Sequence, residues 1–235
     1  MPDFSKRSYK KELLDRTDIP FADIKRNMQE LEFINSNLGG HQITISGLHS
    51  LCKEQPNELL SVCEIGCGGG DNLKAIEKWS KKNNSVLKLI GIDINKDCIE
   101  YAKENCSTLN NKEFFTSDYR EVNFTANKPD VIFSSLFTHH LNDEQFIEML
   151  KWSKRNSVKG FFINDLHRHF LAFYSIRLLT RIFSKSYLVK NDAPLSVQRG
   201  FRKKELEDLL QQAAIKHYTI KWKWAFRWLI IVKHE

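Results

Sequence analysis

A glycine-rich segment at residues 62–70 (Val-Cys-Glu-Ile-Gly-Cys-Gly-Gly-Gly) is the first part of the sequence whose residue types suggest chemistry. It follows an apolar run that predicts a strand and precedes an amphipathic stretch that predicts a helix. Glycines at such a junction let the backbone approach a ligand closely at the helix N-terminus. The dinucleotide fingerprint requires glycine at position 71, where the sequence has Asp71. Glu64 and Asp71 would also repel a pyrophosphate, so the segment favours a zwitterionic or cationic ligand such as a sulfonium cofactor.

Two further carboxylates follow predicted strands. Asp93 lies near the end of an apolar run at 86–94, where it can accept both hydroxyl hydrogens of a ribose. Asp118 follows a shorter run at 112–116 and is placed to accept from an adenine amine. Taken alone, each acid is more often a helix cap or a turn residue. Because the carboxyl ends of parallel strands meet along one crevice, the acids and the glycine segment together predict one binding site.

Histidines supply the candidate catalytic groups. Five of the eight follow predicted elements at this edge of the sheet: His41, His139, His140, His167 and His169. The pKa of imidazole lies near neutrality, which suits a base that removes the proton from an oxygen nucleophile. We therefore expect the catalytic base among His140, His167 and His169, although one of each neighbouring pair could instead pack or cap a helix. Arg168 could anchor an anionic acceptor.

Short apolar runs alternate with amphipathic stretches from residue 59 onward. This alternation predicts an α/β fold in which helices cover both faces of a mostly parallel sheet. Two runs separated by about two residues close the chain and should pair as an antiparallel hairpin. The expected strands lie at 59–65, 86–94, 112–116, 130–134, 160–164, 217–223 and 226–233. The expected helices lie at 72–81, 97–105, 170–183, 203–214 and after a capping box formed by Asn142 and Gln145.

The first forty residues have a helical pattern. Apolar residues recur at helical spacing on both sides of a break at 18–20, and Leu38-Gly39-Gly40 ends the second helix. A third helix is expected at 45–53. We interpret residues 1–41 as a helical N-terminal cap and 42–235 as the main domain, with a helical lid insertion at about 166–200.

As a set, these features resemble the class I S-adenosylmethionine-dependent methyltransferases, over about residues 40–235. The resemblance implies a doubly wound, Rossmann-like sheet of seven strands with a reversed last strand, and S-adenosyl-L-methionine as the cofactor. It places the methionine moiety at 64–70, the ribose at Asp93, and the adenine at Asp118 and Tyr119. The cofactor-binding residues implied are Glu64, Gly66, Cys67, Gly68, Asp93, Ile94, Asp118, Tyr119 and Ser134.

Segments 138–141 (Thr-His-His-Leu) and 164–169 (Asn-Asp-Leu-His-Arg-His) are similar to the quinone-biosynthesis branch and to enzymes that tailor polyketide phenols and phenolic lipids. This similarity implies methyl transfer to a small aromatic acceptor, with a phenolic oxygen favoured. The alternatives are carbon methylation of a quinone or polyketide ring, or transfer to a carrier-bound chain. An RNA-binding methyltransferase and a non-catalytic cofactor-binding protein are further alternatives. No Asn-Pro-Pro-Tyr type motif follows the fourth strand, which counts against DNA substrates.

Positive charge is concentrated in the last third of the chain. Residues 1–150 hold 18 basic and 23 acidic side chains, whereas residues 151–235 hold 18 basic and 6 acidic ones, a net of +12. The basic part suits an anionic acceptor, an acidic carrier protein or an anionic membrane surface. The stretch 170–183, with Arg177 and Arg181, is either a lid over the acceptor or a membrane-binding helix. Basic and aromatic residues alternate at 221–228, as in nucleic-acid platforms and equally in edge hairpins, so nucleic acid is not the favoured partner.

Cysteine usage and hydropathy bear on the compartment. The five cysteines are an odd number without CxxC spacing, which predicts neither a disulfide framework nor a zinc site, and no metal is expected. The first residues lack the apolar core of a signal peptide, and no run of about 18 apolar residues occurs. We therefore expect a reducing cytoplasm, with peripheral contact to a membrane if the basic helix binds lipid.

Overall fold

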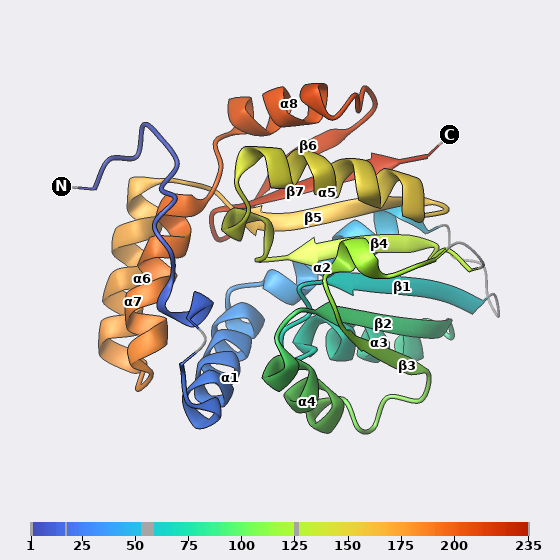
Figure 1. The fold of residues 1–235 in the computed structure, drawn as a ribbon, viewed down its shortest axis with the longest axis horizontal. Coiled ribbons are helices and arrows are strands. Elements are labelled where there is room, and N and C mark those ends of the chain that lie inside the picture. The colour runs from blue at the N-terminus through green and yellow to red at the C-terminus, as the bar shows by residue number, and fades with distance from the viewer. Residues whose placement is uncertain (1, 17, 53–58, 125–126, 235) are drawn as a thin grey trace.

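A seven-stranded, mostly parallel sheet forms the centre of the protein (Figure 1). The structure is a computed structural model that describes residues 2–16, 18–52, 59–124 and 127–234. The strand order is β3-β2-β1-β4-β5-β7-β6, and β7 runs antiparallel to both of its neighbours. The strands are β1 Leu59–Ile65, β2 Val86–Asp93, β3 Lys112–Thr116, β4 Val131–Ser135, β5 Gly160–Leu166, β6 Thr219–Lys223 and β7 Arg227–Lys233. This order confirms the predicted doubly wound sheet that ends in an antiparallel hairpin.

Helices cover both faces of the sheet and also its carboxyl edge. On one face lie α2 (Gly40–Leu51), α3 (Asp71–Lys82) and α4 (Lys96–Asn105), and on the other lie α5 (Asp143–Asn156) and α8 (Lys203–Gln212). A third group of helices, α1 (Phe21–Asn37), α6 (Phe170–Phe183) and α7 (Tyr187–Arg199), faces the carboxyl ends of the parallel strands, at the left of Figure 1. The short 3-10 turns are η1 (Leu13–Asp15), η2 (Tyr119–Glu121) and η3 (Thr138–His140). Among the residues described, every helix is too short or too polar to span a lipid bilayer.

Continuous apolar runs explain why the central strands are parallel and enclosed. All five residues of β4 are buried, as expected for a strand covered on both faces. Phe133 of β4 and Phe162 of β5 stack with ring centroids 4.9 Å apart in the cluster beneath α2 and α3. Ile132 and Phe161 belong to the cluster on the opposite face, with α5 and α8. The core therefore lies above and below the sheet, and the strand ends stay open to a ligand.

The N-terminal segment differs from the prediction. The expected first helix is only the single turn η1, because its backbone is held by another element: the N–H groups of Leu13 and Leu14 donate to the carboxylate of Asp192 on α7. The expected third helix is α2, which begins at Gly40 rather than at residue 45. Gly39, with φ +79°, changes the chain direction between α1 and α2.

Two differences lie in the C-terminal half. Helix α7 was not expected, because Pro194 lies inside it and proline usually ends a helical pattern. The loop of the β6–β7 hairpin has three residues rather than two. The capping box at the start of α5 is confirmed: Gln145 donates its N–H to Asn142 and accepts the Asn142 N–H, at 2.8 and 3.0 Å.

Candidate active site

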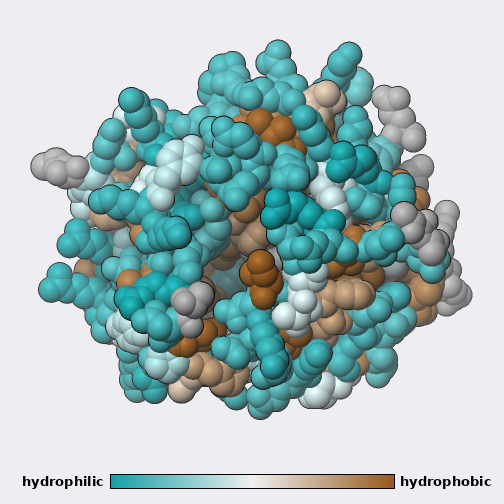
Figure 2. Space-filling model, in the orientation of Figure 1, coloured by the Kyte–Doolittle hydropathy of each residue, from teal (hydrophilic) through white to brown (hydrophobic). Residues whose placement is uncertain are grey.

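The carboxyl edge of the sheet opens into a cavity of about 790 Å³. Its walls come from the ends of β1, β2 and β4, from α1 with the segment before it, and from α6 and α7. Figure 2, in the orientation of Figure 1, shows a hollow in the molecular surface near the centre of the view. Ligand pockets commonly measure about 300–1,000 Å³. This cavity therefore has room for a large ligand or for two smaller ones side by side.

The glycine loop between β1 and α3 forms one wall. Gly66 has φ +69°, and a Cβ at this position would lie 2.4 Å from the ring of Phe137. Gly68 has φ +49° and faces open space, and its N–H donates to Asp93 at 2.9 Å. Cys67 also lines the cavity. The predicted loop thus presents bare backbone to the cavity at the N-terminus of α3, as a closely bound ligand requires.

Glu64 is a buried carboxylate on the same wall, with 1% of its surface exposed. Asn72 donates to its Oε1 at 2.8 Å, whereas the buried Oε2 has no hydrogen-bond partner among the described residues. Burial raises the pKa of Glu64 well above its ordinary value, and the charge of Asp71 raises it further. A half-satisfied buried carboxylate fits the ammonium group of an amino-acid ligand.

Asp93 ends β2 where the large cavity meets a second one of about 280 Å³. Its two oxygens accept from the N–H groups of Gly68 and Asn95, each at 2.9 Å. Each carboxylate oxygen has a further lone pair, so Asp93 retains the capacity to accept from hydroxyl groups. The next residue, Ile94, is 74% exposed and borders both cavities. The family resemblance assigns the ribose to Asp93 and implies that Ile94 packs against the adenine ring.

Asp118 and Tyr119 line the second cavity. Asp118 is bound to its neighbour Arg120: the guanidinium reaches both carboxylate oxygens, at 3.0 and 2.5 Å, and lowers the pKa of Asp118. Tyr119 packs edge to face on Trp152, with ring centroids 5.2 Å apart. An adenine in this cavity would therefore meet a charged carboxylate that already has a partner.

Ser134, which the family resemblance places at the cofactor, does not line the cavity. It is fully buried, its hydroxyl has no hydrogen-bond partner among the described residues, and its neighbour Ser135 lines the cavity. Side chains alternate between the two faces of a strand, so adjacent serines point in opposite directions.

Arg227 reaches the cavity from β7. Its Nη2 donates to Asn35 at 3.2 Å, whereas its buried Nη1 has no partner among the described residues. Burial lowers the pKa of Arg227 to about 10. This guanidinium supplies an unpaired donor for an anionic group of a ligand.

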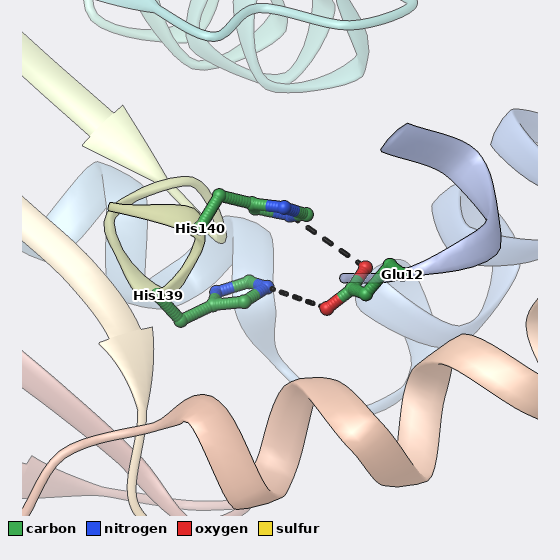
Figure 3. Close-up of side chains that lie close together, drawn as sticks. All are labelled: Glu12, His139 and His140. Carbon is green, nitrogen blue, oxygen red and sulfur yellow. Dashed lines mark ion pairs between the residues drawn. The ribbon is translucent and has the colours of Figure 1, made fainter. Parts of the chain in front are cut away.

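A second group of polar side chains stands on the cavity wall, in Glu12, His139 and His140. Figure 3 shows both imidazole rings directed at the Glu12 carboxylate. The Nε2 atoms of His139 and His140 lie 3.7 Å from the Oε1 and Oε2 atoms of Glu12, respectively. One ligating atom from each of the three residues lies within 4.8 Å of the others, so the group could hold a metal ion.

Each imidazole is backed by its own carboxylate. Asp165, on β5, lies 2.8 Å from Nδ1 of His139, and Asp15 lies 3.2 Å from Nδ1 of His140. Burial opposes the charge on both acids, but the histidines outweigh it: the pKa of Asp165 lies far below its ordinary value, and that of Asp15 falls to about 2. Carboxylates in these positions fix the ring orientation and leave each Nε2 directed toward the cavity wall.

Arg199, on α7, ties the histidine turn to the N-terminal segment. Its guanidinium donates to the carbonyl oxygens of His139 and His140 at 3.1 and 2.9 Å, and to that of Lys10 at 2.7 Å. Ser196, also on α7, donates to Glu12 at 2.7 Å. Burial raises the pKa of Glu12. These contacts bring Glu12 to the sheet edge although it is far away in the sequence.

The other predicted histidines lie outside the residues that line this cavity. His167 accepts from the indole of Trp222 at 3.3 Å, and burial lowers its pKa to about 4. His169 caps α6 by accepting from the N–H of Leu171, and its ring stacks on Phe226. These are the packing and capping roles that were the alternative for one member of each pair. Of the three expected bases, His140 is the one that lines the cavity.

Arg168 cannot anchor an acceptor, because it is 1% exposed and its guanidinium is engaged by Glu205 at 2.5 and 3.0 Å. Part of the positive charge of the last third is thus structural. Sequence reasoning did not single out Glu12 and Asp165, and it left His139 out of the three expected bases. His139 lies in segment 138–141 and Asp165 in segment 164–169, and the family similarity of these two segments could have pointed to both residues. Nothing local marks Glu12.

Residues 62–160 match a family model described as a methyltransferase domain. This match shows that residues 62–160 form a methyltransferase domain, and the sheet order is that of the class I methyltransferase fold.

Solved structures agree with this fold. The plantazolicin methyltransferase BpumL, in complex with S-adenosylhomocysteine (SAH), is 19% identical, with a TM-score of 0.66 over 93% of this chain and 92% of that one. A SAM-dependent methyltransferase from Aquifex aeolicus is 17% identical, with a TM-score of 0.61 over 92% and 99% of the two chains. Magnesium protoporphyrin IX methyltransferase from Synechocystis PCC 6803, with bound SAH, is 14% identical, with a TM-score of 0.58 over 86% and 88%.

Proposed function

We propose that this methyltransferase transfers the methyl group of S-adenosyl-L-methionine to an oxygen of a small aromatic acceptor. The favoured acceptor is a phenol of a polyketide, a quinone precursor or a phenolic lipid. The observation that carries the proposal is one cavity with the glycine loop, Glu64 and Asp93 on one wall and the carboxylate-backed pair His139 and His140 on another. Displacement at a sulfonium needs its two reactants side by side, and this cavity has the volume for both.

Methyl transfer to oxygen is favoured over transfer to carbon because His139 and His140 would lie next to the acceptor. A phenol must lose its proton to become a strong nucleophile, and a group that holds the proton or stabilises the oxyanion accelerates that loss. His139 and His140 supply such a wall. An acceptor hydroxyl placed there would lie within reach of imidazole nitrogens.

Apolar side chains form a large part of the remaining cavity wall, which favours an aromatic acceptor. They come from the helices and segments of the cap and the insertion: Ile19, Ile24, Met28, Leu31, Ile34, Leu166, Ile176, Ala193 and Val197. Plantazolicin and magnesium protoporphyrin IX, in the names of two structural neighbours, are likewise small-molecule or peptide acceptors.

Turnover with methyl-labelled cofactor and a panel of phenols, hydroxyquinones and alkylresorcinols tests the proposal. We expect labelled product from phenolic members, with the methyl carbon at the chemical shift of an aryl ether. A methyl group on a ring carbon would establish the alternative, carbon methylation. Salt-sensitive RNA binding together with RNA methylation would replace the small-molecule assignment.

The residues on the outer face of α6 favour binding of the protein to an anionic lipid surface, where it could take up a hydrophobic acceptor. Ile176 of this helix lines the cavity, whereas Arg177 and Arg181 are exposed on its outer side. Large apolar side chains are exposed beside them: Phe170, Leu171, Tyr174, Leu178 and Ile182. Basic residues among exposed apolar ones are characteristic of helices that lie in a membrane interface.

Aromatic contacts extend this surface to the hairpin. The His169 ring lies 4.7 Å from Phe170 and 5.3 Å from Phe226, and the exposed Trp224 lies 6.4 Å from Phe226. Tryptophan favours the bilayer interface, where its apolar ring and polar N–H both find partners.

Co-sedimentation with phosphatidylcholine vesicles, with and without phosphatidylglycerol, tests the membrane contact. We expect binding that requires the anionic lipid and is lost when Leu178 and Ile182 are both replaced by Asp. Val158→Asp, at an exposed apolar residue outside α6, is the matched control. Equal sedimentation with both vesicles would exclude the membrane role and leave α6 as a lid.

A further inference from the structure

Glu12, His139 and His140 also have the residue types and the spacing of a metal-binding site. We propose that these three side chains bind a divalent transition-metal ion, with zinc as the representative case, on the wall of the methyltransferase cavity. The sequence predicts no metal, because its cysteines lack zinc-site spacing and this ligand set comes from two segments that are distant in the sequence.

The distances fit metal ligation better than direct hydrogen bonding. Glu12 lies 3.7 Å from Nε2 of both histidines, which is longer than a hydrogen bond between these atoms. Two ligands that each bind zinc at about 2.1 Å in a tetrahedral site lie about 3.4 Å apart. A shift of a few tenths of an ångström would therefore bring Glu12 and the two imidazoles to ligating distance.

The carboxylates that contact the two histidines are arranged as they are around the histidine ligands of known metal sites. Histidine ligands usually bond their second ring nitrogen to a carboxylate, which fixes the ring and raises its basicity. Here Asp165 and Asp15 are those carboxylates, one for each ring, at 2.8 and 3.2 Å from Nδ1. Both Nε2 atoms consequently face Glu12, as Figure 3 shows.

The charge of the group also calls for a cation. The ionisable groups in contact with it include three carboxylates, Glu12, Asp15 and Asp165, against the single guanidinium of Arg199, which lies 4.0 Å from Glu12. With neutral imidazoles this leaves two negative charges in excess, which a divalent cation would neutralise.

The ligand types select the class of ion. Imidazole with one carboxylate suits zinc and its neighbours among the first-row metals rather than calcium or magnesium, which prefer oxygen ligands. Three protein ligands on a cavity wall leave a coordination position for a ligand oxygen, as in catalytic zinc sites. On the proposed function, a cation bound there would favour the ionised form of an acceptor hydroxyl.

Metal binding can be measured without cofactor or acceptor. We propose equilibrium dialysis of tag-free, metal-stripped protein against Zn²⁺, with elemental analysis, and the visible spectrum of the Co²⁺-loaded protein. One ion per chain is expected, with Co²⁺ absorption typical of four or five ligands. Glu12→Gln and His140→Gln should each weaken binding by more than tenfold, and Asp15→Asn by about tenfold. The matched control, His167→Gln, should bind as the wild type does.

Circular dichroism and melting curves separate lost binding from lost folding. If Glu12→Gln does not fold, the milder Asp15→Asn variant carries the test. Absence of stoichiometric binding by the wild type would overturn the proposal, as would binding unchanged in the Glu12 and His140 variants. Neither result bears on the proposed function, which is tested separately by SAH binding and by labelled methyl transfer.

Discussion

Replacing Glu64 by Gln tests the proposed contact of this carboxylate with the cofactor ammonium separately from its effect on the fold. The substitution keeps the shape of the side chain and an oxygen for Asn72, and removes only the charge. The carboxylate is 1% exposed, its Oε2 has no hydrogen-bond partner among the described residues, and burial and Asp71 raise its pKa. In the unliganded protein this charge is therefore unfavourable.

The two expected effects have opposite signs. A charge-assisted hydrogen bond from the cofactor ammonium to Glu64 is worth about 1.5–3 kcal/mol, so Glu64→Gln should weaken SAH binding about 10- to 150-fold. The raised pKa means that the protein without ligand loses stability as pH rises from the ordinary carboxyl pKa toward the raised pKa of Glu64. The variant without ligand should thus melt no lower than the wild type at neutral pH, and higher at alkaline pH.

Calorimetry in buffers of different ionisation enthalpy measures both the affinity and the protons released. Cofactor binding should release protons from wild-type Glu64, because the ammonium favours the carboxylate, and the variant should release fewer. The matched control is Glu77→Gln, a buried acid on α3 that pairs with Lys81 and is absent from the cavity lining. An SAH affinity unchanged within twofold in Glu64→Gln would refute the assignment of Glu64 to the ammonium.

Further substitutions test the glycine loop and a buried histidine. Gly66→Ala should destabilise the fold by about 3 kcal/mol, because the new Cβ would lie 2.4 Å from Phe137 at a positive φ, whereas Gly68→Ala should cost only about 1 kcal/mol and mainly weaken SAH binding. Equal melting temperatures for the two variants would contradict this. The pKa of His167 is lowered to about 4, so its neutral form adds stability above pH 6.5 that is lost as pH falls toward 4. Allowing for partial exposure, His167→Gln should reduce the loss of unfolding free energy between pH 7.5 and 5 by about 1 kcal/mol in urea titrations, and an unchanged pH dependence would disprove the role of this burial.

Local patterns were sufficient for most of the fold. Four of the parallel strands are mostly buried apolar runs and the fifth, β3, is a half-exposed edge strand, and their alternation with helices leaves few ways to arrange them. The capping box at Asn142 and Gln145 is likewise a local signal that the structure confirms. Helix α7 escaped prediction because Pro194 breaks the local pattern, while its packing against α6 and the N-terminal segment keeps it helical.

The sequence by itself was sufficient to predict the methyltransferase class and the wall assigned to the cofactor, because glycines and acids at strand ends lie where a parallel sheet must gather them. Only the tertiary structure decided which polar groups lie elsewhere on the cavity wall. His139 and His140 are adjacent and follow the same strand, yet their roles depend on the 3-10 turn that aims both rings at Glu12. Glu12 arrives through contacts of the N-terminal segment with α7, which no local pattern encodes. His167 and His169 follow β5 as expected, but the hairpin and α6 engage their rings away from the cavity.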